Sequence, residues 1–252
     1  MTNYDALEQQ LVSTLGLTRR PVAIAFLDSP PAGVSKFAGA VPAGCSFWRL
    51  ASEGRVFFTV PEDHYNCPIG SYTHNIPLPP GRAAELGATL GLMADIGYLR
   101  MAEVPGIAVL PKTPAAVVYA PLGDTPVDPD VVIFRGPAAR VMLLQEAATS
   151  ARVSATLNTL GRPTCMALPA ALAHGVVMST GCVGNRIYTG LEEGELYAAA
   201  PGRDLGTLAR TCGTIASANA KLREYHEGRR RQLTEGAGVV KFAREITSVQ
   251  GG

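Results

Sequence analysis

Two cysteines lie in similar stretches of this chain, and both stretches could hold a metal-binding thiolate. In NCPIG (66–70), Cys67 precedes a proline and lies three residues before a glycine. In TGCVGNR (180–186), Cys182 lies between two glycines. Proline stiffens a turn and removes one amide donor, whereas glycine lets other backbone amides approach a sulfur atom. Because such amides stabilise a thiolate, both stretches suit a ligand held in a turn.

Cys45 and Cys165 extend this pattern, because each precedes one of the two glycine-marked cysteines. The spacings are C-x21-C and C-x16-C. They differ from the C-x-x-C knuckles of zinc ribbons, whereas iron–sulfur clusters accept ligands from separate segments. A cysteine before a proline also occurs at the last ligand of bacterial ferredoxin motifs. We therefore expect a redox protein in which Cys45, Cys67, Cys165 and Cys182 ligate an iron–sulfur cluster of the [4Fe–4S] type.

The same residues allow other cofactors and other chemistry. Haem could take the Cys67 thiolate or the nearby His64 as an axial ligand, and zinc could take the four thiolates. A nucleophile at Cys182 could act on a small anionic substrate, in which case the protein would be an enzyme. Disulfides within each cysteine pair and plain packing of the thiols are further alternatives. The sequence leaves all of these open, whereas Cys212 lies inside a predicted helix and is expected in the core.

Arg186 follows Cys182 by four residues and is the candidate for a positive charge at the site. The turn around Gly181 and Gly184 offers free backbone amides, which favour anions together with a guanidinium group. We expect Arg186 to neutralise the charge of a cluster or of a substrate. The nucleotide motifs G-x-G-x-x-G and G-x-x-x-x-G-K-[ST], the H-E-x-x-H motif and the G-x-S-x-G motif do not occur, so none of their activities is predicted.

Composition narrows the class of protein. The 252 residues are 47% hydrophobic and 17% charged, with a net charge of +1. This predicts one folded domain (1–252) without a broad attraction to nucleic acid or to anionic membranes. No apolar run reaches the roughly 18 residues of a membrane span, and the first residues do not look like a signal peptide. We expect a cytoplasmic protein whose partner is an electron-transfer protein or a small anionic ligand, with homo-oligomers as an open alternative.

Apolar periodicity predicts a mixed fold, either α/β or α+β, in which helices cover small sheets. Strands are predicted at 21–30, 55–61, 115–122, 130–136, 176–179 and 195–201. Longer helices are predicted at 4–15, 82–99, 137–151 and 204–233.

An internal echo divides the chain into two pseudo-repeated halves, roughly 18–100 and 112–233. In each half a strand is followed by a cysteine, a short helical segment, a second strand and a second cysteine. The strand RPVAIAFLDSP (20–30) aligns with TPAAVVYAPLGDTP (113–126), which suggests an ancient duplication. Equivalent cysteine pairs would then face each other across a pseudo-two-fold axis, so the four thiols would converge.

These segments together resemble the prokaryotic family known as domain of unknown function 169. The resemblance rests on PVAIAF (21–26), NCPIG (66–70), the stretch 119–144, STGCVGNR (179–186) and ELYAAAPG (195–202), and it covers roughly residues 5–230. It implies that the family pattern includes the four cysteines and Arg186. It implies no particular activity, because that of the family is not settled.

Overall fold

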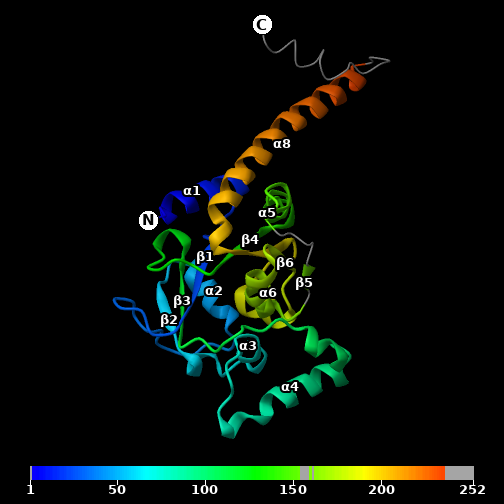
Figure 1. Cartoon of the computed structure of the whole chain (residues 1–252). Coiled ribbons are helices and arrows are strands. Elements are labelled where there is room, and N and C mark those ends of the chain that lie inside the picture. Colours follow the sequence, from blue (N-terminus) through cyan, green and yellow to red (C-terminus); the bar gives the residue numbers. More distant parts are fainter. Residues whose placement is uncertain (1, 154–158, 161, 236–252) are drawn as a thin grey trace.

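A mixed sheet of seven strands forms the centre of the computed structural model, which describes residues 2–153, 159–160 and 162–235 (Figure 1). The strand order is β2-β3-β1-β4-β7-β6-β5. All neighbours are antiparallel except β5, which pairs parallel with β6. The strands are β1 (Val22–Leu27), β2 (Phe57–Thr59), β3 (Ala116–Pro121), β4 (Val131–Pro137), β5 (Thr159–Leu160), β6 (Val177–Ser179) and β7 (Glu195–Pro201). The predicted mixed fold of helices and sheet is confirmed.

Alternation along the strands gives the sheet two buried faces. In β4, Val131 and Ile133 contribute to one hydrophobic core, and Val132 and Phe134 contribute to the other. Successive side chains of a strand point to opposite faces, so a continuous apolar run such as VVIF is typical of a strand that is covered on both sides.

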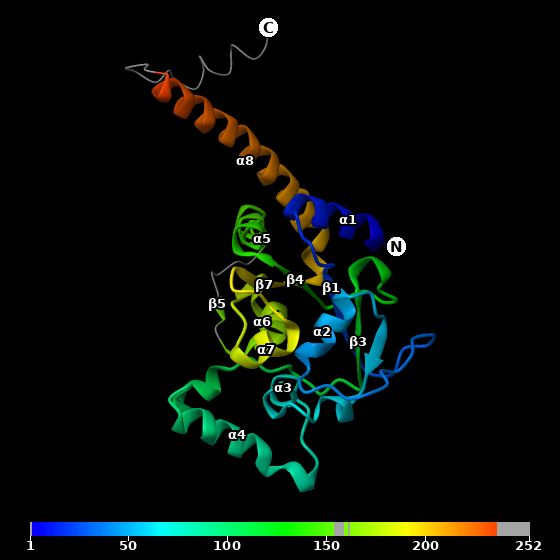
Figure 2. The same ribbon diagram turned by 180° about the vertical axis from the view of Figure 1, so that it is seen from behind.

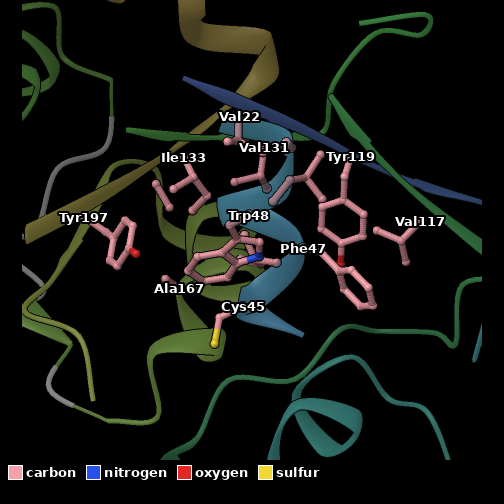
Figure 3. Close-up of a cluster of buried hydrophobic side chains, with 14 of the residues drawn as sticks. Val22, Cys45, Phe47, Trp48, Val117, Tyr119, Val131, Ile133, Ala167 and Tyr197 are labelled. Atoms are coloured by element: carbon pink, nitrogen blue, oxygen red, sulfur yellow. The ribbon is translucent and has the colours of Figure 1, made fainter. Parts of the chain in front are cut away.

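Helices cover both faces of the sheet (Figures 1 and 2), and the four predicted ligand cysteines lie in or beside the helices of one face. This cysteine face carries α2 (Cys45–Ser52), α3 (Pro68–Thr73), α6 (Ala167–His174) and α7 (Val183–Thr189). The opposite face carries α1 (Tyr4–Leu15), α5 (Ala138–Ser150) and α8 (Leu205–Thr234). Figure 3 shows the core of the cysteine face, where the Trp48 ring of α2 lies between Tyr197 and Phe47.

The strand order is symmetric about the contact between β1 and β4. From the centre outward, one side reads β1, β3, β2 and the other reads β4, β7, β6. The topology thus matches β1 with β4 and β3 with β7, and not β1 with β3 as in the sequence alignment above. This symmetry groups β3 with the N-terminal half of the chain, whereas the predicted boundaries place residues 112–122 in the C-terminal half. The duplication itself stays a prediction.

A segment between the first cysteine pair and β3 stands apart from the two cores. It consists of α4 (Ala84–Asp95), a loop and a 3₁₀ helix at Met101–Gly106, and we call residues 84–106 the arm. The predicted helix 82–99 ends at Asp95, because the chain turns at Gly97 with φ of 72°, a conformation that favours glycine. Leu90 is the one residue of α4 that is buried, so the arm packs loosely against the rest of the molecule.

The last helix projects beyond the sheet (Figures 1 and 2). Its buried residues, Leu205, Leu208, Ala209 and Cys212, all lie near its start. The residues from Ser217 to Leu222 are exposed. Among the described residues, no helix combines the length and the apolar content that a membrane span requires.

The distribution of burial along α8 predicts how much of the helix the fold needs. A chain that ends at Ala220 should unfold with the same free energy as the full chain, within about 0.5 kcal/mol in urea titrations, because exposed residues contribute little. Leu208→Ala should cost about 2–5 kcal/mol, because it opens a cavity in a closed core. A truncation as costly as Leu208→Ala would contradict this assignment.

Candidate functional site

The four predicted ligand cysteines each lie at the start of a helix. Cys45 is the first residue of α2, and Cys67 and Cys182 are the N-cap residues of α3 and α7. Cys165 lies in the 3₁₀ turn Thr164–Met166 that leads into α6. Helix α2 packs against α7, and α3 packs against the turn of Cys165. These contacts cross between the two sides of the sheet and bring the four cysteines to the wall of one pocket.

Backbone amides surround the sulfur of Cys67. The Gly70 amide donates a hydrogen bond to Sγ at 3.2 Å, and the amides of Gly44 and Ile69 also approach the thiol. A Cβ atom on Gly70 would lie 3.1 Å from Sγ, tighter than an ordinary contact, so a glycine gives the amide its close approach. This arrangement agrees with the turn that the sequence predicts around Cys67.

Hydrogen bonds also connect the cysteine segments with one another. The Cys182 amide donates to Oγ1 of Thr164 at 2.5 Å, which fixes α7 to the turn of Cys165. The Cys165 thiol lies 3.9 Å from the carbonyl oxygen of Ile69, two residues beyond Cys67. In contrast, Cys212 is buried in the core of the opposite face, as expected, and all five cysteines are free.

Burial keeps three of these thiols in the neutral form. It raises the pKa of Cys45 to about 12 and that of Cys165 well above its usual value. It also raises the pKa of Cys67, although the amides of Gly70 and Gly44 oppose the rise. Repulsion between thiolates contributes as well: the charges of Cys67 and Cys182 raise the pKa of both Cys45 and Cys165. Several thiolates can therefore coexist here only beside a positive charge.

The pocket beside the thiols has a volume of about 940 Å³. Its inner end is formed by the cysteines and Asn185, and the arm forms much of the remaining wall. Figure 3 shows the Cys45 sulfur pointing away from Val131 and Ile133 of the sheet. In the part of the chain that the structure describes, no three His, Cys, Asp or Glu side chains form a group that could hold a single metal ion.

His64, a predicted cofactor ligand, lies behind the thiols and does not line the pocket. Its Nε2 atom is 2.9 Å from Oγ1 of Thr59, and its ring lies 5.2 Å from that of His74. Both histidines are 2% exposed. His74 Nδ1 donates to the carbonyl oxygen of Gly70 at 2.8 Å, so this histidine supports the helix that begins at Cys67.

Arg186, the predicted positive charge, has other partners. Its guanidinium group donates to the carbonyl oxygens of Leu191, Glu192 and Glu195, at 3.0–3.4 Å. It is not among the residues that line the pocket. Arg186 thus ties α7 to the segment that precedes and begins β7, and the structure does not bring its charge to the thiols.

Sequence reasoning missed two features of the site. Asn185 is 2% exposed and lines the pocket next to Cys45. The arm supplies apolar side chains, among them Leu90, Met93 and Leu99. The only signal for Asn185 was its place three residues after Cys182, one helical turn from the N-cap. For the arm, the signal was a helix with few charges on any side.

Comparison with known proteins identifies the family of this chain. Residues 10–211 match the family described as DUF169, uncharacterised ArCR. The chain therefore belongs to this family, and the resemblance inferred from the sequence is confirmed. No curated protein and no solved structure gives a significant match. The matched range contains all four site cysteines and ends near the last buried residue of α8.

The two buried histidines predict that the fold weakens in mild acid. Burial lowers the pKa of His74 to about 4 and that of His64 well below its usual value. The unfolded chain binds protons near pH 6.5 and the folded chain does not, so stability should fall as the pH falls from about 6.5 to about 4. At pH 5, His74 alone should account for a loss of about 2 kcal/mol, measured by urea unfolding.

The matched variants for this test are His74→Phe and His226→Gln, since His226 is exposed on α8. His74→Phe should lose part of the pH dependence, whereas His226→Gln should keep it. An unchanged pH dependence in His74→Phe would show that the neutral imidazole is not required.

Gly181 should be the least replaceable glycine of the Cys182 turn. It has φ of 78°, and a Cβ atom there would lie 2.7 Å from Leu191 and 3.0 Å from Asn185. Gly190 has φ of 64° but no neighbour within 4 Å of such an atom. Gly190→Ala should cost about 1 kcal/mol of backbone strain. Gly181→Ala should cost more in the same urea titration, because steric overlap adds to the strain, and equal costs would refute the crowded geometry.

Proposed function

We propose that this protein is a redox protein that holds one iron–sulfur cluster through Cys45, Cys67, Cys165 and Cys182. The observation that supports the proposal is the convergence of these four thiols, from four separate segments, on the inner end of one pocket. Plain packing would not require all four to meet, and the fifth cysteine packs on the opposite face.

The charges at the site favour a positively charged group among the sulfurs. A buried thiol with a raised pKa stays protonated in the absence of a cation, whereas metal binding displaces the proton and leaves a thiolate. The amides near Cys67 could donate to the sulfur of a ligating thiolate, which is a usual way to stabilise and tune a cluster.

The grouping of side chains favours a cluster over a single zinc ion. Four sulfurs at about 2.3 Å from one tetrahedral zinc lie about 3.8 Å from each other. A cluster distributes its four thiolates over several irons and accepts a wider spacing. The described residues offer no group suited to a single ion, which counts against zinc as the occupant.

The structure bears on two alternatives, a cysteine nucleophile and haem. A nucleophilic cysteine needs a lowered pKa, whereas those of Cys45, Cys67 and Cys165 are raised, so these three lose support as nucleophiles and Cys182 stays the alternative. Haem ligation by His64 would require that side chain to reach the pocket, which it does not line. Haem ligation by Cys67 would give a different absorption spectrum from that of a cluster.

Free thiols at a buried site fit a reducing compartment, and we infer a cytoplasmic location. A redox role there also needs an electron-transfer partner, whose identity the site does not specify.

The absorption spectrum of protein purified without oxygen tests the proposal. We expect broad visible absorption that dithionite bleaches, with iron and inorganic sulfide in equal amounts. Cys67→Ala should remove most of this absorption. Cys212→Ala, the matched control, should keep it, because Cys212 lies on the opposite face of the sheet.

Three results would contradict the proposal. A sharp Soret band would indicate haem, and a colourless protein that stays iron-free after anaerobic addition of iron and sulfide would leave the thiols without a cluster. Equal absorption in the Cys67→Ala and Cys212→Ala variants would show that the bound iron lies elsewhere.

A further inference from the structure

The pocket is much larger than an inorganic cluster requires. Pockets that bury small organic molecules have volumes of about 300–1,000 Å³, and this one, at about 940 Å³, lies near the upper end. A cluster among the cysteines would occupy only its inner end. The outer part, between the thiols and the arm, is therefore available to a second molecule.

The wall of this outer part is apolar. On the arm it includes Leu90, Met93, Leu99 and Val104, and on α7 it includes Val183 and Tyr188. At the mouth, Leu92 is 61% exposed, Ile96 is 68% exposed and Val183 is 60% exposed. Single exposed apolar side chains are common, but a group around a concave site marks a surface for binding. These residues would lose contact with water if an apolar molecule lay beneath the arm.

Two polar groups of the pocket, the Asn185 amide and the Arg162 guanidinium, bear on what could bind there. The Asn185 amide lies within reach of a hydrogen bond to the Cys45 thiol and to the Tyr197 hydroxyl, but neither its oxygen nor its nitrogen forms one of good geometry in the described part of the chain. A buried amide whose hydrogen bonds are poorly formed is costly. Because Asn185 lies at the inner end beside Cys45, it faces whatever occupies the space among the thiols.

The second group is the guanidinium of Arg162 at the pocket wall. It lies 4.4 Å from the ring centroid of Tyr98, and among the described residues it forms no ion pair with a carboxylate. The nearby Glu103 attracts Arg162 at longer range but is paired directly with Arg100. Arg162 is exposed and is thus free to pair with an acidic group of a bound molecule.

We propose that the pocket binds an organic acid with an apolar body of drug-like size. The body lies between the arm and the thiols, and the acidic group pairs with Arg162. The depth of the pocket and charge complementarity at Arg162 favour such a ligand over a second protein chain, which would cover the apolar mouth without filling the pocket. The inference goes beyond the proposed cluster and does not depend on it.

A pair of fluorescent dyes tests both the apolar pocket and the acidic group on the full-length protein. 8-Anilinonaphthalene-1-sulfonate has an apolar ring system and an acidic group, and N-phenyl-1-naphthylamine has the same rings without the sulfonate. Both dyes should bind saturably with one site per chain. Arg162→Gln should weaken the sulfonate dye about threefold and leave the neutral dye unchanged. Met93→Glu should weaken both about tenfold or more, because it places a charge on the apolar wall.

Leu222→Glu is the matched control for Met93→Glu, because Leu222 is 52% exposed on α8, well away from the pocket residues. It should change neither affinity, and near-ultraviolet circular dichroism should show that all variants are folded. Absence of saturable binding, or full binding by Met93→Glu, would overturn the pocket assignment. Equal loss of both dyes in Arg162→Gln would overturn the acidic group.

Sedimentation of the same samples tests the competing occupant. A dimer that Met93→Glu converts to a monomer, with dye binding unchanged, would identify the mouth as a subunit contact and would overturn the inference. Iron and sulfide measured in these samples keep the two proposals separate, since the dyes report on the outer pocket whether or not a cluster is present.

Discussion

The antiparallel pairing of β1 with β4 is the contact on which the cysteine site depends. Val22 pairs with Ile133 and Ile24 pairs with Val131, and this contact joins the two sides of the sheet at its centre. An antiparallel pair of strands has local two-fold symmetry. The segments that follow the two strands are therefore brought together across the symmetry axis. Helix α2 thereby meets α7, and α3 meets the turn before α6. Without this pairing, the two cysteine pairs would have no fixed relation.

The same arrangement explains why the thiols differ from ordinary core cysteines. Each begins a helix, where backbone amides are free and where a partial positive charge favours an anion. Yet burial, with Coulombic repulsion, opposes ionisation. Because these effects oppose each other, the thiols are neutral when no cation is bound. They are suited to lose their protons when a cation lies among them. The pair His64 and His74, both neutral and buried, supports the cysteine segments from behind without adding charge.

The sequence predicted that the four cysteines would lie near one another, from glycine-marked turns and a repeated order of elements, and in the structure all four line one pocket; that they ligate a cluster stays a prediction. It did not predict the partners of Arg186, because spacing within one helix does not reveal that the side chain turns back to the carbonyls of Leu191 and Glu192. The burial of His64 depends on Phe47 of α2, whose ring lies 5.2 Å from that of His64, a contact that residue spacing does not reveal. The correspondence of β1 with β4 was missed because apolar strands of similar length look alike in a sequence. Only the order of the hydrogen-bonded strands in the sheet shows which strands occupy equivalent places.

Native mass spectrometry of the full-length chain, reconstituted with iron and sulfide without oxygen, tests the central claim most directly. The account predicts one dominant species whose added mass equals four irons and four sulfides per chain. It also predicts that this species disappears when a cysteine from either half is replaced, as in Cys45→Ala or Cys182→Ala. A chain without added mass, or an adduct that survives both replacements, would contradict the claim that thiols from the two halves hold a single centre.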